Sequence, residues 1–172
     1  MTAEMWKPYI GQVADGRYRL KSLLGVGGFG AVFLADHVVA GRVLREAAVK
    51  LIMPDEEMAE AQMRELGGAI RFKHPHLIEC YDAGLWRLET HSLLYLVMEV
   101  ADGQLSKDLK AGPLSGMEVR TLVESVASAL AYLHSRPERM VHTWGFGASV
   151  KAVFLDFYCF IDSVLSVSER HS

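Results

Sequence analysis

Two stretches decide the fold of this chain: Leu24-Gly25-Val26-Gly27-Gly28-Phe29-Gly30-Ala31-Val32 and, a short distance later, Ala47-Ala48-Val49-Lys50. The glycines at positions 25, 27 and 30 allow a strand-turn-strand backbone to fold closely over an anion, because a Cβ atom there would block the approach of the backbone amides. Lys50 adds a positive charge in an apolar segment. The two stretches together predict a site for the phosphates of a nucleotide.

A glycine pattern of this kind also occurs in dinucleotide-binding turns and in plain hairpins, so its context matters. The dinucleotide version opens a helix, whereas here Ala31-Val32-Phe33-Leu34-Ala35 is β-prone and residues 45–52 form a second apolar strand. Lys50 as a surface lysine is a further alternative. The segments downstream favour the phosphate site.

The pattern resembles the glycine-rich flap of protein kinases, and the next segments extend the resemblance. Residues 55–72 predict a helix, with Pro54 and acids at its start and apolar residues at helical spacing. In the family this helix carries a glutamate that pairs with the strand lysine, which implies Glu65 as the partner of Lys50. An exposed helix acid is the alternative for Glu65. His74-Pro75-His76-Leu77-Ile78 is similar to the motif that follows this helix in the family.

The stretch Leu94-Tyr95-Leu96-Val97-Met98-Glu99-Val100-Ala101-Asp102-Gly103 is similar to the fifth strand and the hinge of the family. The resemblance makes Met98 the gatekeeper, a core residue that also borders the nucleotide pocket. It implies that the backbone of residues 99–101 binds the adenine edge and that Asp102 or Asp108 faces the ribose.

The resemblance thus implies ATP as the ligand. The implied nucleotide-binding residues lie in the loop, on the neighbouring strands, in the helix and at the hinge: Leu24, Gly25, Val26, Gly27, Gly28, Phe29, Gly30, Val32, Ala48, Lys50, Glu65, Met98, Glu99, Val100, Ala101 and Asp102.

Ser115-Gly116-Met117-Glu118 is a capping box, which predicts the start of a helix. This helix is similar to the long central helix of the family's helical lobe. Its apolar residues recur on one face; they are Val119, Leu122, Val126, Leu130 and Leu133.

The resemblance stops at His142. The family continues with Arg-Asp-Leu-Lys-Pro, but this chain continues with Thr143-Trp144-Gly145-Phe146-Gly147. The aspartate that accepts the substrate proton is therefore missing, and the chain contains no asparagine that could hold magnesium. Asp156-Phe157-Tyr158 is a poor substitute for the family's magnesium-binding Asp-Phe-Gly, because tyrosine lacks the backbone freedom of glycine. We expect no catalytic residues and no metal ligands in this chain.

These observations predict an α+β fold that resembles a kinase small lobe, with a five-stranded antiparallel sheet and one helix, followed by the beginning of the helical lobe. The expected parts are a lead-in at residues 1–17, loose over 8–16, the small lobe at 18–101, the hinge exit and first helical-lobe segment at 102–142, and a tail outside the family at 143–172. The break at His142 suggests a truncation before the catalytic loop.

The tail contains an apolar, aromatic segment at residues 152–161. It is shorter than a membrane-spanning helix, and Asp156 and Asp162 would be costly in a bilayer. We expect the segment to cover an apolar surface, or to be encoded outside the original reading frame.

Composition narrows the function further. The 21 acidic and 18 basic residues give a net charge of −3, which is not typical of a nucleic-acid-binding protein. Cys80 and Cys159 lack the spacing of a metal or disulfide site, and the first five residues do not resemble a signal peptide. These features favour a cytoplasmic protein.

Three hypotheses follow. The chain is an active serine/threonine kinase that phosphorylates protein hydroxyls, an ATP-binding module without catalysis, or a nonfunctional or scaffolding fragment of a disrupted kinase reading frame that self-associates through an exposed lobe interface. The missing catalytic loop speaks against the first. The serine/threonine class rests on the resemblance, through the first strand at Arg17-Tyr18-Arg19-Leu20 and the lack of an insertion typical of tyrosine-specific relatives.

Overall fold

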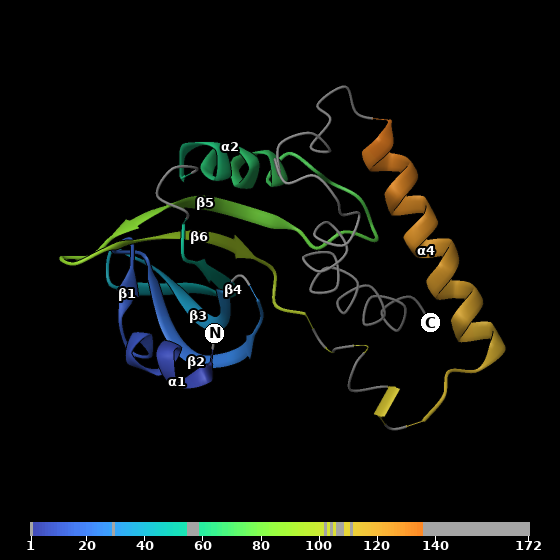
Figure 1. The fold of residues 1–172 in the computed structure, drawn as a ribbon, viewed down its shortest axis with the longest axis horizontal. Coiled ribbons are helices and arrows are strands. Elements are labelled where there is room, and N and C mark those ends of the chain that lie inside the picture. The colour runs from blue at the N-terminus through green and yellow to red at the C-terminus, as the bar shows by residue number, and fades with distance from the viewer. Residues whose placement is uncertain are drawn as a thin grey trace. The chain divides into compact units, whose positions relative to one another are not determined.

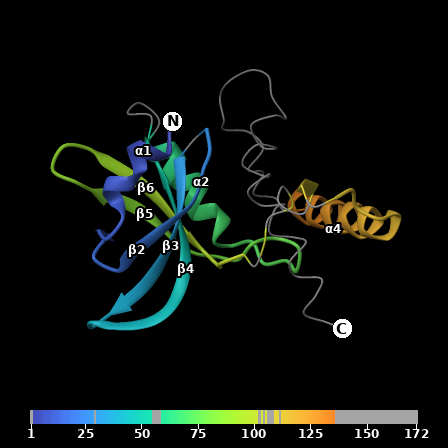
Figure 2. The ribbon, with the colours of Figure 1, turned by 90° about the horizontal axis from the view of Figure 1, so that it is seen from below.

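The computed structural model of the chain describes residues 2–28, 30–54, 59–101, 103, 105, 109–110 and 112–135, apart from the side chains at 59, 61 and 65. Two compact units are present. The first combines Met1–Arg71 with Cys80–Val100, and the second combines Phe72–Glu79 with Ala101–Ser172. Figures 1 and 2 show the sheet and the helices from two directions.

The elements follow one another in this order: α1 (Ala3–Trp6), the 3-10 helix η1 (Lys7–Tyr9), β1 (Val13–Ala14), β2 (Tyr18–Val26), β3 (Gly30–Val39), β4 (Arg42–Ile52), α2 (Ala59–Ala69), β5 (Cys80–Arg87), β6 (Ser92–Met98) and α4 (Gly116–His134). The sheet has the strand order β1-β2-β3-β4-β6-β5, and all neighbouring strands are antiparallel. The predicted α+β fold is confirmed, with the short β1 added at the edge of the five expected strands. The expected helix is α2, which packs against β5 and β6.

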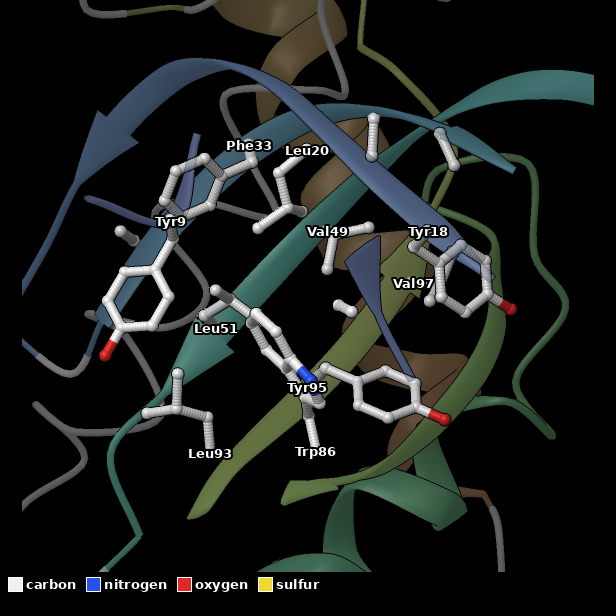
Figure 3. Close-up of a cluster of buried hydrophobic side chains, with 14 of the residues drawn as sticks. Tyr9, Tyr18, Leu20, Phe33, Val49, Leu51, Trp86, Leu93, Tyr95 and Val97 are labelled. Atoms are coloured by element: carbon white, nitrogen blue, oxygen red, sulfur yellow. The ribbon is translucent and has the colours of Figure 1, made fainter. Parts of the chain in front are cut away.

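Alternate residues of the central strands face opposite sides of the sheet, because side chains alternate along a strand. On β4, Ala47, Val49 and Leu51 belong to one buried apolar cluster, which Figure 3 shows in close-up. Aromatic and aliphatic residues from the other strands complete this cluster; among them are Tyr18, Leu20, Phe33, Trp86, Leu93, Tyr95 and Val97. We call this side of the sheet the core face. The opposite side carries Ala48 and Lys50.

The N-terminal segment is folded, and the expectation of a loose lead-in is therefore wrong. Trp6 is fully buried and packs edge-on against Phe33, with the ring centroids 6.4 Å apart. Tyr9 packs edge-on against Trp86, and its hydroxyl lies 2.8 Å from Nε2 of His91. Pattern reasoning missed this because the partners of the segment are far away in the sequence.

Backbone hydrogen bonds also hold the N-terminal segment, which we call the N-terminal strap (residues 2–14). The Gly11 amide donates to the Leu20 carbonyl at 2.7 Å, and the Leu20 amide donates to the Gln12 carbonyl at 2.9 Å. Gly11 has a φ of +88°, a conformation that glycine adopts without strain. The strap is thus joined to β2 and closes the core face.

In the second unit, α4 begins with the predicted capping box. The Ser115 hydroxyl accepts from the Glu118 amide at 3.3 Å, and the Glu118 carboxylate accepts from the Ser115 amide at 2.7 Å. These two bonds satisfy amide groups that a helix start leaves without partners.

The predicted apolar residues of α4 lie on its less exposed side, apart from Val119 near the start of the helix. Ser125 and Ala129 are buried on this side, and the apolar residues beside them are partly buried; these are Leu122, Val126, Leu130 and Leu133. The segment Phe72–Glu79 supplies the contacts on α4: the ring of Tyr132 lies against Phe72 and His74.

Among the helices of the described ranges, none combines the length and the hydropathy that crossing a bilayer requires.

We predict that Trp6→Ala lowers the free energy of unfolding by about 3–5 kcal/mol, because it removes a buried aromatic side chain and leaves a cavity. The matched control is Ile10→Ala in the same segment, since Ile10 is 42% exposed and its truncation changes the free energy by less than about 1 kcal/mol. Urea unfolding followed by circular dichroism measures both variants. Equal, small losses would show that the strap is not part of the core.

Candidate functional site

The glycine loop is the turn between β2 and β3. The Gly27 amide donates to the Gly30 carbonyl at 2.9 Å, which closes the turn. Leu24, Gly25 and Val26 form the end of β2, and Gly30 begins β3. Phe29 lies outside the described residues. The predicted strand-turn-strand arrangement is therefore present.

The four glycines of this loop are not equivalent. A Cβ atom at Gly30 would overlap the backbone carbonyl of Leu51 on β4, so close packing of two strands requires glycine there. At Gly25, Gly27 and Gly28, a Cβ atom would meet no heavy atom within 4 Å. None of the three has a positive φ. Packing therefore explains Gly30 and leaves the other three unexplained.

Lys50 lies on the side of the sheet opposite the core face. It pairs with Val32 on β3 and with Leu96 on β6. Its neighbour on the same side, Ala48, pairs with Met98. The predicted residues Val32, Ala48, Lys50 and Met98 thus lie on one side of the sheet, on three strands.

Met98 ends β6 and is 8% exposed, which fits a core residue that also borders a site. Glu99, Val100 and Ala101 follow outside regular secondary structure and are partly buried. Asp102 and Asp108 lie outside the described residues, so their proposed contact with a ribose stays a prediction.

Glu65 lies in α2, which packs against β5 and β6. Its side chain lies outside the described part of the chain. An ion pair between Glu65 and Lys50 therefore remains a prediction that follows from the resemblance.

The arrangement can bind an anion next to a flat apolar group. Open space above Gly25, Gly27 and Gly28 lets backbone amides approach an anion, and the lysine ammonium supplies a point charge. Val32 and Ala48 offer small apolar walls beside it. Among the described residues, no group of three or more His, Cys, Asp or Glu side chains is arranged to hold a metal ion.

A polar network near the start of β2 was missed by sequence reasoning. The Tyr18 hydroxyl donates to the Asp82 carboxylate at 2.7 Å, and Arg17 lies 3.0 Å from the same carboxylate. Arg17 also contacts Asp15 at 2.6 Å, and the Tyr95 hydroxyl donates to Asp15 at 2.8 Å. The only sign of this network in the sequence is the acidic Asp82 within a mostly apolar strand.

The network shifts the pKa values of its members. Burial and the hydrogen bond to Asp82 raise the pKa of Tyr18, and burial and the hydrogen bond to Asp15 raise that of Tyr95. Burial opposes the charged form of Asp15, but hydrogen bonds from Arg17 and Tyr95 outweigh it and lower the pKa of this carboxyl. At neutral pH the two hydroxyls are therefore donors and Asp15 is an ionised acceptor.

The chain is similar to protein kinases in both sequence and fold. A sequence profile described as "Protein kinase domain" matches residues 18–143. Serine/threonine-protein kinase PrkC of Bacillus subtilis (strain 168) is 31% identical over 139 residues, which cover 77% of this chain and 20% of the relative. CBL-interacting protein kinase 4 of Oryza sativa subsp. japonica is 35% identical over 135 residues, which cover 73% of this chain and 28% of the relative.

A solved crystal structure of a kinase domain superposes with a TM-score of 0.58 at 15% sequence identity. The match covers 73% of this chain and 37% of that one, and it shows a shared fold. The matched part of the chain spans 20% of the length of the first curated relative and 28% of the length of the second.

We predict that Gly30→Ala lowers the free energy of unfolding by about 1–3 kcal/mol, because β3 and β4 must separate to admit the methyl group. Gly27→Ala is the matched control in the same turn and changes it by less than about 0.5 kcal/mol. Thermal and urea unfolding measure both. If the two variants lose equal stability, the distinction between the glycines is wrong.

Proposed function

This chain belongs to the protein kinase domain family, and on that premise we propose that it is the ATP-binding N-terminal portion of a serine/threonine protein kinase. Intact members of the family bind ATP and then transfer its phosphoryl group to the hydroxyl groups of proteins. The serine/threonine class is supported by the relative from Bacillus subtilis, which is 31% identical and carries that class in its name.

The glycine loop is the observation that carries this proposal. Packing requires only Gly30 to be glycine, while Gly25, Gly27 and Gly28 face open space. A bound phosphate would explain these three, because backbone amides can approach an anion closely only where no side chain intervenes. The residues present therefore fit a triphosphate.

The other residues of the site have complementary roles in this proposal. Lys50 would contact the phosphates, since it lies between Val32 and Leu96 on the same side of the sheet as Ala48. The base would lie between small apolar side chains, with its polar edge at the backbone of residues 99–101. When bound, ATP supplies the phosphoryl group, and magnesium neutralises its charge in the intact family.

We also propose that this chain alone does not transfer the phosphoryl group. Transfer needs a carboxylate to accept the substrate proton and a set of metal ligands. The residues after His142 are Thr143-Trp144-Gly145, with no aspartate at the position of the catalytic base, and the sequence contains no asparagine. Binding without chemistry is the function that these residues support.

We predict that Lys50→Ala weakens ATP binding about tenfold or more, because one charge-assisted contact to the phosphates is lost. Lys7→Ala is the matched control, since Lys7 is an exposed lysine of the N-terminal strap. Isothermal titration calorimetry with ATP measures both variants. Identical titrations of the unaltered chain and Lys50→Ala would refute an ATP site at this lysine.

We further predict that the purified chain, given ATP, magnesium and a generic protein substrate, transfers no more phosphate than its Lys50→Met variant. Radiolabelled ATP makes small amounts of transfer visible. Transfer by the unaltered chain that disappears in Lys50→Met would show that catalytic groups exist in spite of the sequence after His142.

The second candidate is a nonfunctional or scaffolding fragment of a disrupted kinase reading frame. The abrupt change of sequence after His142 favours it. The calorimetric experiment separates the two candidates, because a fragment of this kind would be folded over the first unit and yet show no saturable binding of ATP.

A further inference from the structure

Strand β5 contains one extra residue beside the end of β6. Cys80 pairs with Met98, but Asp82 pairs with Val97, so Tyr81 is inserted as a β-bulge. A bulge changes which side of the sheet the following residues face. Trp86 belongs to the core cluster, whereas Cys80 pairs with Met98 outside that cluster. In a regular strand both would face the same side, because their positions differ by an even number.

Side chains on the core face hold both residues of the bulge. The guanidinium of Arg45 lies 3.7 Å from the centroid of the Tyr81 ring, a cation–π contact between β4 and β5. Asp82 accepts a hydrogen bond from Tyr18 at 2.7 Å and is paired with Arg17 at 3.0 Å. We call these five residues the bulge clamp.

The bulge lies beside the last two residues of β6, where the chain leaves the sheet and enters the hinge. Met98 is the last residue of β6, and it is held between Ala48 on β4 and Cys80 on β5. Without the bulge, the register of β5 would move by one residue, and Cys80 would face the core instead of accompanying Met98. The position of Glu99 therefore depends on the bulge.

We propose that Arg45 and Tyr81 are positioning residues for recognition of the nucleotide base: by holding the bulge, they fix the hinge backbone that receives the adenine edge. This inference rests on the ATP site proposed above. Neither residue touches the base in this proposal. They act through Cys80 and Met98.

The bulge clamp should affect binding of the base but not binding of the phosphates, because it lies far from the glycine loop. Arg45 precedes Lys50 by five residues on β4, which is about 17 Å along a strand. It precedes Ala48, the partner of Met98, by only three residues, or about 10 Å. Loosening the clamp should leave the glycine loop and Lys50 in place.

The test compares Arg45→Met with Arg42→Met in the full chain. Arg42 is an exposed arginine at the first position of the same strand, which makes it a matched control. Calorimetry measures binding of ATP and of inorganic tripolyphosphate, which has no base. We expect Arg45→Met to bind ATP about three- to fivefold more weakly, to bind tripolyphosphate as the unaltered chain does, and Arg42→Met to change neither.

Two substitutions at Tyr81 add a second arm. Tyr81→Phe keeps an aromatic face for Arg45 and should keep most of the ATP affinity, whereas Tyr81→Leu should lose as much as Arg45→Met. Amide hydrogen exchange gives a readout that needs no ligand. Exchange at residues 97–100 should become faster in Arg45→Met and Tyr81→Leu, and exchange at residues 25–30 should stay unchanged.

Several results would overturn the inference. Equal weakening of ATP and tripolyphosphate in Arg45→Met would show a general effect on the fold. Unchanged amide exchange at residues 97–100 in Arg45→Met would show that the bulge clamp does not hold the hinge. A loss of ATP affinity in Tyr81→Phe as large as in Tyr81→Leu would show that the aromatic face is not what matters. If the unaltered chain binds neither ligand, the proposed ATP site fails, and this inference fails with it.

Discussion

The antiparallel pairing of β3 with β4 is the constraint on which the rest of the structure depends. Gly30 fits against the Leu51 carbonyl only because it has no side chain, and the resulting register places Val32 opposite Lys50. A slip by one residue would turn Lys50 into the aromatic core and bring Val49 out of it. Burying an unpaired ammonium there would cost several kcal/mol, so the register and the position of the lysine are specified together.

The two faces of the sheet carry different side chains, and the packing of one face fixes the positions of the residues on the other. The core face is closed by the N-terminal strap, with Trp6 against Phe33. The opposite face carries Lys50 among small and apolar residues. Because the same strands form both faces, the packing of the core face holds Lys50 and its neighbours in place.

Local chemistry explains what the sequence could predict. The glycine turn, the strand with Lys50 and the capping box at Ser115 each depend on residues close in the chain, and all three are present. The strap could not be predicted, because Trp6 and Tyr9 are anchored by partners that no local pattern connects to them. The Asp82 network was hidden for the same reason. The pairing of Glu65 remains a prediction.

The strap has a consequence for the order in which the molecule can fold. Tyr9 and His91 are separated by 82 positions, and their hydrogen bond joins the first helical turns to the β5–β6 hairpin. Closing so long a loop carries an entropic cost that only the finished core offsets. During synthesis, Tyr9 therefore cannot reach its final packing before the hairpin of β5 and β6 has been made. Until then Tyr9 lacks its partners Trp86 and His91, and the nascent chain offers an apolar surface to chaperones.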